Sequence, residues 1–272
     1  MASIITNILD KLKKIDETYK DPRTESVFIG SPQFIFSILS IYTIYVLYLG
    51  PKIMANRSPR NIKGILLLYN FAQVALNGIL AVWSLYRLII LRPYDSLLCM
   101  TVQKDNTEAA SVELRIVYSY LLLKMLDLMD TVFFVLRKST KQITFLHVYH
   151  HIMVALGSFL YARYSPGGHV LMISILNSIV HVVMYFYYLM SALRLKYFNV
   201  AGLKKYITQL QLLQFVIFVI SFGITLFIEC DYQLWAKIWG CFQSVFVLLL
   251  FLNFYLKSYL QKSKQKSTYK TQ

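Results

Sequence analysis

The stretch QITFLHVYHHIMVALGSFLY, residues 142–161, combines a length that can cross a bilayer with three histidines. A transmembrane α-helix needs about 20 predominantly apolar residues. Ionisable residues inside such a helix are costly and by default mark a functional site. His147, His150 and His151 stand at i, i+3 and i+4, and therefore on one face of the helix. The stretch predicts a membrane helix that forms one wall of a polar site.

The composition of the whole chain indicates an integral membrane protein. Of its 272 residues 57% are hydrophobic, and the mean hydropathy is +0.52. A soluble domain rarely reaches such values. Only helices and closed barrels satisfy every backbone polar group in a bilayer, and long continuous apolar runs mean helices. The predicted fold class is all-α, a polytopic membrane protein with seven transmembrane helices at about 33–50, 65–91, 112–136, 143–161, 169–191, 206–228 and 234–256.

Basic residues gather in alternate connecting segments. Residues 51–63, 137–141, 194–205 and the tail from 257 together carry 16 Lys or Arg and no acidic residue. The positive-inside rule places these segments in the cytosol, so we expect a luminal N-terminus and a cytosolic C-terminus. The net charge of +15 then orients the chain against anionic phosphate groups at one membrane face. No nucleic-acid partner is expected.

Three parts of the chain follow from this pattern. Residues 1–32 form a luminal N-terminal segment, residues 33–256 the membrane domain, and residues 257–272 a basic cytosolic tail. Apolar residues of the first part recur at helical spacing, which predicts an amphipathic helix on the membrane surface, with a loosely ordered tail as the alternative. These residues are Ile5, Ile8, Leu9, Leu12 and Ile15.

Two of the three cysteines fall in segments predicted to be luminal. Cys99 lies in the second of these segments and Cys230 in the last. Because the lumen is oxidising, we predict a disulfide between them, with three free thiols as the alternative. Cys241 lies within the last predicted helix and is expected to serve only in packing.

Three other predicted helices also carry polar residues. The stretch KMLDLMDT, residues 124–131, places Lys124, Asp127 and Asp130 at i, i+3 and i+6, on one broad helix face. The simpler interpretation is a structural ion pair between Lys124 and Asp127. The remaining polar residues are Asn177 and His181 in NSIVHVVMYFYY (177–188), and Thr208, Gln209, Gln211 and Gln214 in TQLQLLQ (208–214).

Depth in the membrane relates these groups to one another. Counted inward from the predicted cytosolic helix ends at about 1.5 Å per residue, polar groups of four helices reach similar depths in the cytosolic half. This predicts an enclosed polar chamber that opens toward the basic face.

Three kinds of chemistry fit such a chamber. Histidines spaced as HxxHH occur in membrane di-iron oxidases, but those enzymes need about eight histidines, and this chain has five. A metal-dependent lipid oxidase or hydroxylase with a single metal remains an alternative. A second alternative is a transporter or receptor in which the ionisable residues relay protons. The third is acyl transfer to an imidazole nucleophile in a dry tunnel.

The four motifs, taken in order, resemble those of the ELO-type family of very-long-chain fatty-acid elongases. The block FFVLRKSTKQITFLHVYHH, residues 133–151, is especially close, and the resemblance covers about residues 30–256. The family usually has Glu where this chain has Asp127, so here the carboxylate stands on a shorter stem.

This resemblance implies the activity, the fold and the partners. The activity is that of a 3-ketoacyl-CoA synthase, an acyltransferase of the endoplasmic reticulum membrane that condenses a long-chain acyl-CoA with malonyl-CoA, releasing CO2 and CoA. The fold places helices two to seven in two inverted three-helix units around an acyl tunnel, with the first helix outside. No metal or bound cofactor is implied. The partners are the ketoreductase, dehydratase and enoyl reductase of the elongation cycle, and a second copy of the chain in a homodimer.

The same resemblance assigns roles to the catalytic candidates. His150 is the nucleophile that takes the acyl group, and His147 and His151 orient it or move protons. His181 helps to bind malonyl-CoA or stabilises the enolate formed on decarboxylation, and Asn177 holds a carbonyl oxygen. Three charged residues set the protonation of the chamber and hold the histidines: Lys124, Asp127 and Asp130.

The substrate-binding candidates form three groups. Gln209, Gln211 and Gln214 are expected at the acyl thioester or the pantetheine arm. Three tyrosines are expected in the tunnel wall, with an interfacial aromatic belt as the alternative: Tyr185, Tyr187 and Tyr188. Five basic residues are expected at the CoA phosphates, with a role in topology alone as the alternative: Arg137, Lys138, Lys141, Lys204 and Lys205.

Overall fold

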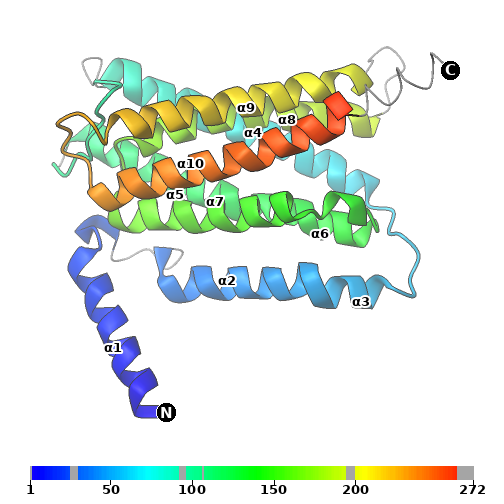
Figure 1. Ribbon diagram of the computed structural model, residues 1–272, viewed down its shortest axis with the longest axis horizontal. Helices are drawn as coiled ribbons and strands as arrows, with labels where there is room; N and C mark the ends of the chain where they lie inside the picture. The colour runs from blue at the N-terminus through cyan, green and yellow to red at the C-terminus, as the bar shows by residue number, and fades with distance from the viewer. Residues whose placement is uncertain (1, 25–29, 92–95, 106, 194–199, 262–272) are drawn as a thin grey trace.

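The computed structural model describes residues 2–24, 30–91, 96–105, 107–193 and 200–261, and every regular element within them is a helix (Figure 1). Part of the predicted N-terminal segment (25–29), Arg194 and Lys196, and most of the predicted basic tail (262–272) lie outside the described residues. The all-α prediction therefore holds for the part of the chain that is described.

Among the described residues, six helical segments are long and apolar enough to cross a membrane. The first, Pro32–Met54, comprises α2 (Pro32–Ile44), a π-helical turn (Tyr45–Leu49) and α3 (Gly50–Met54), and the second, Lys63–Leu91, comprises α4 (Lys63–Tyr86) with a π-helical end. The others lie in α7 (Phe145–Tyr164), α8 (Val170–Leu193), α9 (Val200–Ile224), and α10 (Leu234–Tyr255) with its extension to Gln261.

The remaining predicted span, 112–136, is a broken helix. It forms α5 (Glu108–Asp127) and α6 (Met129–Leu136), which meet at Leu128. Its charged residues keep it outside the six apolar segments, yet Glu113, Lys124 and Asp127 are all buried. The burial is explained by position, because α5 packs against α4, α7 and α8 within the bundle.

Contacts between neighbouring helices close a ring. α4 packs on α8, α8 on α9, α9 on α10, α10 on α7, α7 on α5, and α5 on α4. The α2–α3 segment lies on one side of this bundle, against α6 and α7 (Figure 1). These six helices therefore surround a common interior, and the α2–α3 segment lies outside it.

Local signals explain where several helices begin. The hydroxyls of Ser31, Thr107 and Thr144 accept hydrogen bonds from backbone N–H groups in the first turns of α2, α5 and α7. Between α7 and α8 the chain turns through Gly168, whose φ of 62° is a left-handed conformation that glycine adopts without strain. A Cβ at this position would also lie 2.5 Å from the Met100 carbonyl oxygen.

Several predicted helix ends lie a few residues from those observed, and two of them show why. The first span continues past 50 to Met54, because the π-helical turn before Pro51 accommodates a residue that has no N–H to donate. α9 begins at Val200, not at 206, so Lys204 and Lys205 lie on a helix and not in a connecting segment. A prediction from hydropathy ends a span where a charged residue occurs. A lysine near a helix end can nevertheless remain on the helix, because its long side chain extends the ammonium group toward water.

The end of the bundle opposite the basic residues is held by cross-links. The disulfide expected between Cys99 and Cys230 is present and joins positions 131 residues apart.

α1 (Ala2–Tyr19) is a helix that runs away from the bundle at an angle to the others (Figure 1). Ile15, on its predicted apolar face, is exposed. The structure does not describe the side chains of the other four residues of this face: Ile5, Ile8, Leu9 and Leu12. Its placement on a membrane surface stays a prediction.

Asp16 attaches α1 to the bundle. Its carboxylate accepts hydrogen bonds from the Arg163 guanidinium and, at 2.7 Å, from the Tyr164 hydroxyl. The hydrogen bonds from Arg163 are the main reason that the pKa of Asp16 lies below its ordinary value. Because the folded pKa is depressed, this attachment stabilises the folded state above about pH 4 and is lost as the pH falls through the folded value.

We therefore expect Asp16→Asn to release α1 at neutral pH. Charge-assisted hydrogen bonds of this kind contribute about 1.5–3 kcal/mol, and the attachment of the wild-type helix should also weaken as the pH falls below about 4. The mobility of a spin label at Thr18→Cys, in a Cys241→Ser background, measures both effects. Glu17→Gln makes the same charge change on an exposed neighbour, so equal mobility in the two variants would contradict the role of Asp16.

Candidate active site

A chamber of about 270 Å³ lies at the end of the bundle where basic residues gather. It is lined from six helices, α5 to α10, and from the connection between α6 and α7. Among the predicted site residues, those that line it are Lys124, Asp127, Asp130, Lys141, His147, His150, His151, His181, Tyr187, Tyr188, Lys204 and Gln211. The structure thus brings together residues from all four sequence motifs.

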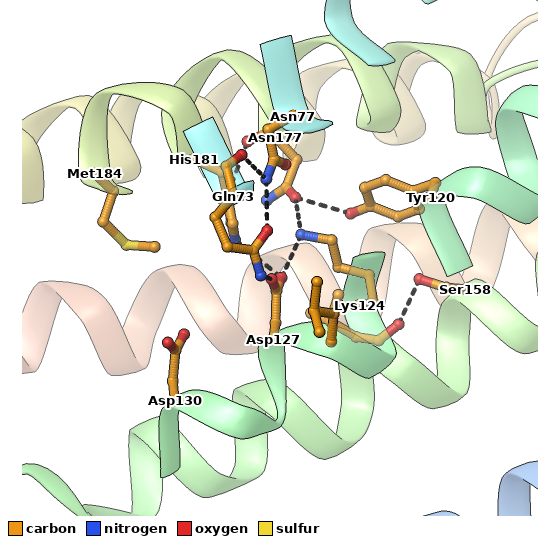
Figure 2. A network of polar contacts seen from close by, with 12 residues as sticks. Gln73, Asn77, Tyr120, Lys124, Asp127, Asp130, Ser158, Asn177, His181 and Met184 are labelled. Carbon is orange, nitrogen blue, oxygen red and sulfur yellow. Dashed lines mark hydrogen bonds and ion pairs between the residues drawn. The ribbon is translucent and has the colours of Figure 1, made fainter. Parts of the chain in front are cut away.

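Lys124 is the centre of a buried hydrogen-bond network. Its ammonium group donates to Asp127 Oδ2 at 2.7 Å and to Asn177 Oδ1 at 2.8 Å, and it lies over the ring of Tyr120 (Figure 2). Tyr120 also donates to Asn177 Oδ1, at 3.1 Å. The ion pair that was the simpler interpretation of this motif is therefore present. It is one contact in a larger network that spans α5 and α8.

Asp127 accepts hydrogen bonds from three different helices. Besides Lys124, its partners are Gln73 Nε2 at 2.8 Å and the Tyr185 hydroxyl at 3.1 Å. His181 Nε2 lies 3.4 Å from Asp127 Oδ2, and His181 Nδ1 is 2.9 Å from the Asn177 carbonyl oxygen, to which it donates. These contacts fix the orientation of the His181 ring. The shorter stem of Asp in place of Glu does not prevent the carboxylate from reaching Lys124.

Asp130 does not contact Lys124 directly (Figure 2) and is linked to its network through Tyr185. Its Oδ2 accepts a hydrogen bond from the Tyr185 hydroxyl at 2.7 Å. The same hydroxyl bonds to Asp127, so the fully buried Tyr185 bridges the two carboxylates, Asp127 and Asp130. It therefore belongs to the polar network and does not line the chamber itself.

The three histidines of α7 have different surroundings. His147 Nε2 lies 2.9 Å from Thr131 Oγ1, and Thr131 in turn lies 2.7 Å from the hydroxyl of Tyr42 on α2. The rings of His147 and His151 are 4.3 Å apart, between centroids. His150 instead lies between Phe215 and Phe251, with its ring edge-on to both. Among the described residues, the carboxylates of Asp127 and Asp130 contact His181 and none of these three histidines, so the expectation that the charged residues hold the histidines applies to His181 alone.

His150 lies where the chamber meets a second cavity. This inner cavity, of about 90 Å³, extends among α5, α7, α8, α9 and α10, and its walls include Phe215, Phe218 and Trp239. His150 and Val154 line both cavities, whereas His147 and His151 line only the outer chamber. His150 Nδ1 is buried and has no hydrogen-bond partner among the described residues. An imidazole with a free nitrogen thus lies at the junction of a polar chamber and an apolar cavity.

Some predicted site residues lie elsewhere. Asn177 and Gln214 line the inner cavity and not the chamber. Gln209 is exposed and donates to the Tyr255 hydroxyl at 2.9 Å, outside both cavities. Lys138 donates to the Ala55 carbonyl oxygen at 3.0 Å. Arg137 and Lys205 are exposed and, like Lys138, do not line the chamber. These positions follow from helix phase, because neighbouring residues on one helix point to different faces.

Sequence reasoning missed the contribution of α4. Gln73 donates to Asp127 Oδ1 and, at 3.0 Å, to the Tyr69 hydroxyl, while Asn77 donates to Gln73 Oε1 at 3.0 Å. Asn70, Gln73 and Asn77 are all buried. Their spacing at i, i+3 and i+7 was the available signal, since a polar stripe on an apolar helix marks the face that points into the bundle.

Sequence reasoning also missed a buried ion pair between Arg87, in the π-helical end that follows α4, and Glu113 on α5. Both side chains are fully buried. The pair lies toward the disulfide end of the bundle, beside the turn between α7 and α8. Gly167 of this turn is so close to Glu113 that a Cβ there would lie 2.5 Å from Glu113 Oε2.

The possible metal ligands are dispersed. Among the described residues, no three His, Cys, Asp or Glu side chains are grouped so that they could hold a metal ion. The groups that face the chamber are imidazoles, carboxylates and ammonium groups, a set suited to nucleophilic attack and proton transfer.

Comparisons with known proteins agree on one family. The family model of ELO, described as the GNS1/SUR4 family, matches residues 27–267. The very long chain fatty acid elongase 1 of Mus musculus is 37% identical over 234 residues, which are 84% of this chain and 81% of the mouse protein. Its counterpart in Homo sapiens is 36% identical over the same shares. The very long chain fatty acid elongase F of Drosophila simulans is 38% identical over 209 residues, 76% of this chain and 79% of the fly protein.

Proposed function

Because the chain belongs to the ELO family of very-long-chain fatty-acid elongases and is a multi-pass membrane protein, we propose that it catalyses the condensing step of elongation. A long-chain acyl-CoA and malonyl-CoA give a 3-ketoacyl-CoA, CO2 and CoA. The observation that supports this most is the position of His150, at the junction of the polar chamber and the inner cavity. The thioester of an acyl chain that fills the inner cavity would lie at this junction.

The proposal includes the membrane arrangement. The α5–α6 segment is a seventh span, and α4 to α10 form two inverted three-helix units. The contacts between helices support this. If α4 is exchanged with α8, α5 with α9, and α7 with α10, every contact of the ring becomes another contact of the same ring, as expected for two equivalent units. The chain lies in the endoplasmic reticulum membrane with its N-terminus luminal and its basic end cytosolic.

The first half-reaction transfers the acyl group to His150. A ring nitrogen attacks the thioester carbonyl carbon, the C–S bond breaks, and the CoA thiolate leaves. The thiolate takes the proton of the other ring nitrogen, which leaves a neutral acyl-imidazole and free CoA. The apolar walls formed by Phe215 and Phe251 exclude water, which would otherwise hydrolyse this intermediate.

The second half-reaction forms the new carbon–carbon bond. Malonyl-CoA loses CO2, and the electron pair of the broken bond forms an enolate on the thioester. The enolate carbon attacks the acyl carbonyl, the N–C bond to His150 breaks, and the imidazole takes up a proton. Lys124, on the chamber wall, donates to the enolate oxygen the ammonium hydrogen that Asp127 and Asn177 do not take, and His181, once protonated, adds a positive charge beside it.

Basic residues at the mouth of the chamber bind CoA. Lys141 and Lys204 both line the chamber and are exposed, so their ammonium groups can meet phosphates of either substrate. Gln211, Tyr187 and Tyr188 line the same chamber and contact the pantetheine arm. The 3-ketoacyl-CoA product then passes to a ketoreductase, a dehydratase and an enoyl reductase, and we propose that the chain works as a homodimer.

An acyl-enzyme is the expected result of incubation with stearoyl-CoA alone. Wild-type protein should release one CoA per chain without malonyl-CoA and carry the acyl group on the peptide that contains His150. Mass spectrometry of the digest and a thiol assay measure the two products. Normal condensation with no acylated peptide at any time would rule out His150 as the nucleophile.

A further inference from the structure

A third cavity lies on the flank of the bundle, between the last turns of α8 and the first turns of α9. Its volume is about 190 Å³, and its eight lining side chains are all apolar or aromatic. Val183 on α8 and Leu203 and Tyr206 on α9 line it and are 40%, 40% and 66% exposed. Both helices belong to the six membrane-spanning segments, so the cavity, here called the side groove, opens toward lipid.

The side groove and the active-site chamber share a wall. Tyr187 on α8 and Ile207 on α9 line both spaces. Two side chains therefore separate the lipid-facing groove from the chamber that holds His150 and His181. Side chains at the edge of such spaces change rotamer within nanoseconds when they are not tightly packed.

Charge at the rim fits the head of an amphipathic ligand. Lys204 lines the chamber, and its neighbour Leu203 lines the side groove. A ligand whose phosphates contact Lys204 would have its apolar chain beside the groove. A long-chain acyl-CoA has this combination of an anionic head and an apolar chain.

The energetics favour entry from the side. Each CH2 group of an acyl chain gains about 0.8 kcal/mol in the bilayer, so the chain of a long acyl-CoA lies in the membrane. Threading the chain through the polar mouth would first return it to water. Passage between α8 and α9 would keep it in apolar surroundings throughout.

We propose that the side groove is an entry site for the fatty-acyl chain of membrane-dissolved acyl-CoA. The chain occupies the groove, displaces the side chains of Tyr187 and Ile207, and moves sideways into the chamber. The inference rests on the proposed condensing function for the identity of the ligand.

Photolabelling of the reconstituted protein tests occupancy. The His150→Ala protein in phosphatidylcholine vesicles, which cannot form the acyl-enzyme, is irradiated with stearoyl-CoA that carries a diazirine in its chain. We expect labelling of Leu203 and Tyr206 that excess unlabelled stearoyl-CoA removes. Ile220, on the lipid-facing side of the same helix and 55% exposed, should show only labelling that does not saturate. Groove labelling that saturates no more than labelling at Ile220 would overturn the proposal.

A pair of matched variants tests passage. Leu203→Trp fills the groove, and Ile220→Trp adds the same bulk elsewhere on α9. We expect release of CoA from membrane-dissolved stearoyl-CoA to slow about tenfold in the first variant and less than twofold in the second. Val183→Trp fills the groove from α8 and replaces Leu203→Trp if its melting temperature shows misfolding. Equal rates in groove and control variants would overturn the proposal.

The two proposals fail in different ways. If wild-type protein forms no 3-ketoacyl-CoA from stearoyl-CoA and malonyl-CoA, the condensing function fails, whereas saturable labelling of the groove still reports an acyl-CoA site. A diazirine on the chain of a phospholipid distinguishes the other occupant. Groove labelling by this probe that stearoyl-CoA does not displace would mean that a structural lipid occupies the groove, which contradicts an entry site.

Discussion

Replacing His150 by alanine is expected to lower the rate of condensation by at least about 10³-fold, because no other imidazole lines both cavities. The protein should remain folded. His150 Nδ1 has no hydrogen-bond partner among the described residues, so its removal leaves no buried donor or acceptor newly unpaired. The measurements are product formation from stearoyl-CoA and malonyl-CoA, and the melting temperature of the purified protein.

His151→Ala is the matched control for this variant. His151 is the next residue, lines only the outer chamber, and lies against His147. Its loss should slow condensation less and should leave the release of CoA from acyl-CoA detectable. If His151→Ala abolished that release while His150→Ala retained it, the two histidines would have to exchange roles.

Replacing Lys124 by methionine should destabilise the protein as well as inactivate it. The ammonium group is almost fully buried and bonds to Asp127 and Asn177, so its removal takes away the nearest cation of the Asp127 carboxylate. Breaking a buried ion pair on one side costs about 3–5 kcal/mol. Thermal unfolding in detergent measures the loss, with Lys141→Met, at an exposed position of the chamber mouth, as the reference.

The double variant Lys124→Met with Asp127→Leu separates charge from packing. Removing both partners leaves no uncompensated buried charge, so we expect it to be more stable than Lys124→Met alone. It should nevertheless be inactive, because His181 would lose the carboxylate that lies 3.4 Å from its Nε2. Destabilisation equal to the sum of the two single changes would show that the pair is not energetically coupled.

The sequence predicted most of the site because charges inside apolar helices have few explanations. Lys124, Asp127 and the four site histidines each stood out against an apolar background, and all of them line the chamber. Helical periodicity gave the face of each helix, and the count of residues gave a common depth. These arguments need only one helix at a time.

Features that depend on neighbouring helices could not be predicted. Gln73 carries no charge and interrupts its apolar run only slightly, so nothing in α4 alone indicated that it bonds to Asp127 on α5. The advantage of His150 over His151 comes from a cavity bounded by five helices. The order of helices around the ring depends on which side-chain surfaces fit together, and hydropathy does not encode that fit.

The disulfide has a consequence for biosynthesis. Cys99 and Cys230 are 131 residues apart, and the loop between them includes Lys124, His150 and His181. A ribosome delivers the second cysteine only after the helices that carry these residues have been synthesised. The bond therefore cannot guide their insertion, because it forms only after the chain has been synthesised as far as Cys230, just before α10. Quality control that reads free thiols would then distinguish chains that have joined these two distant segments from those that have not.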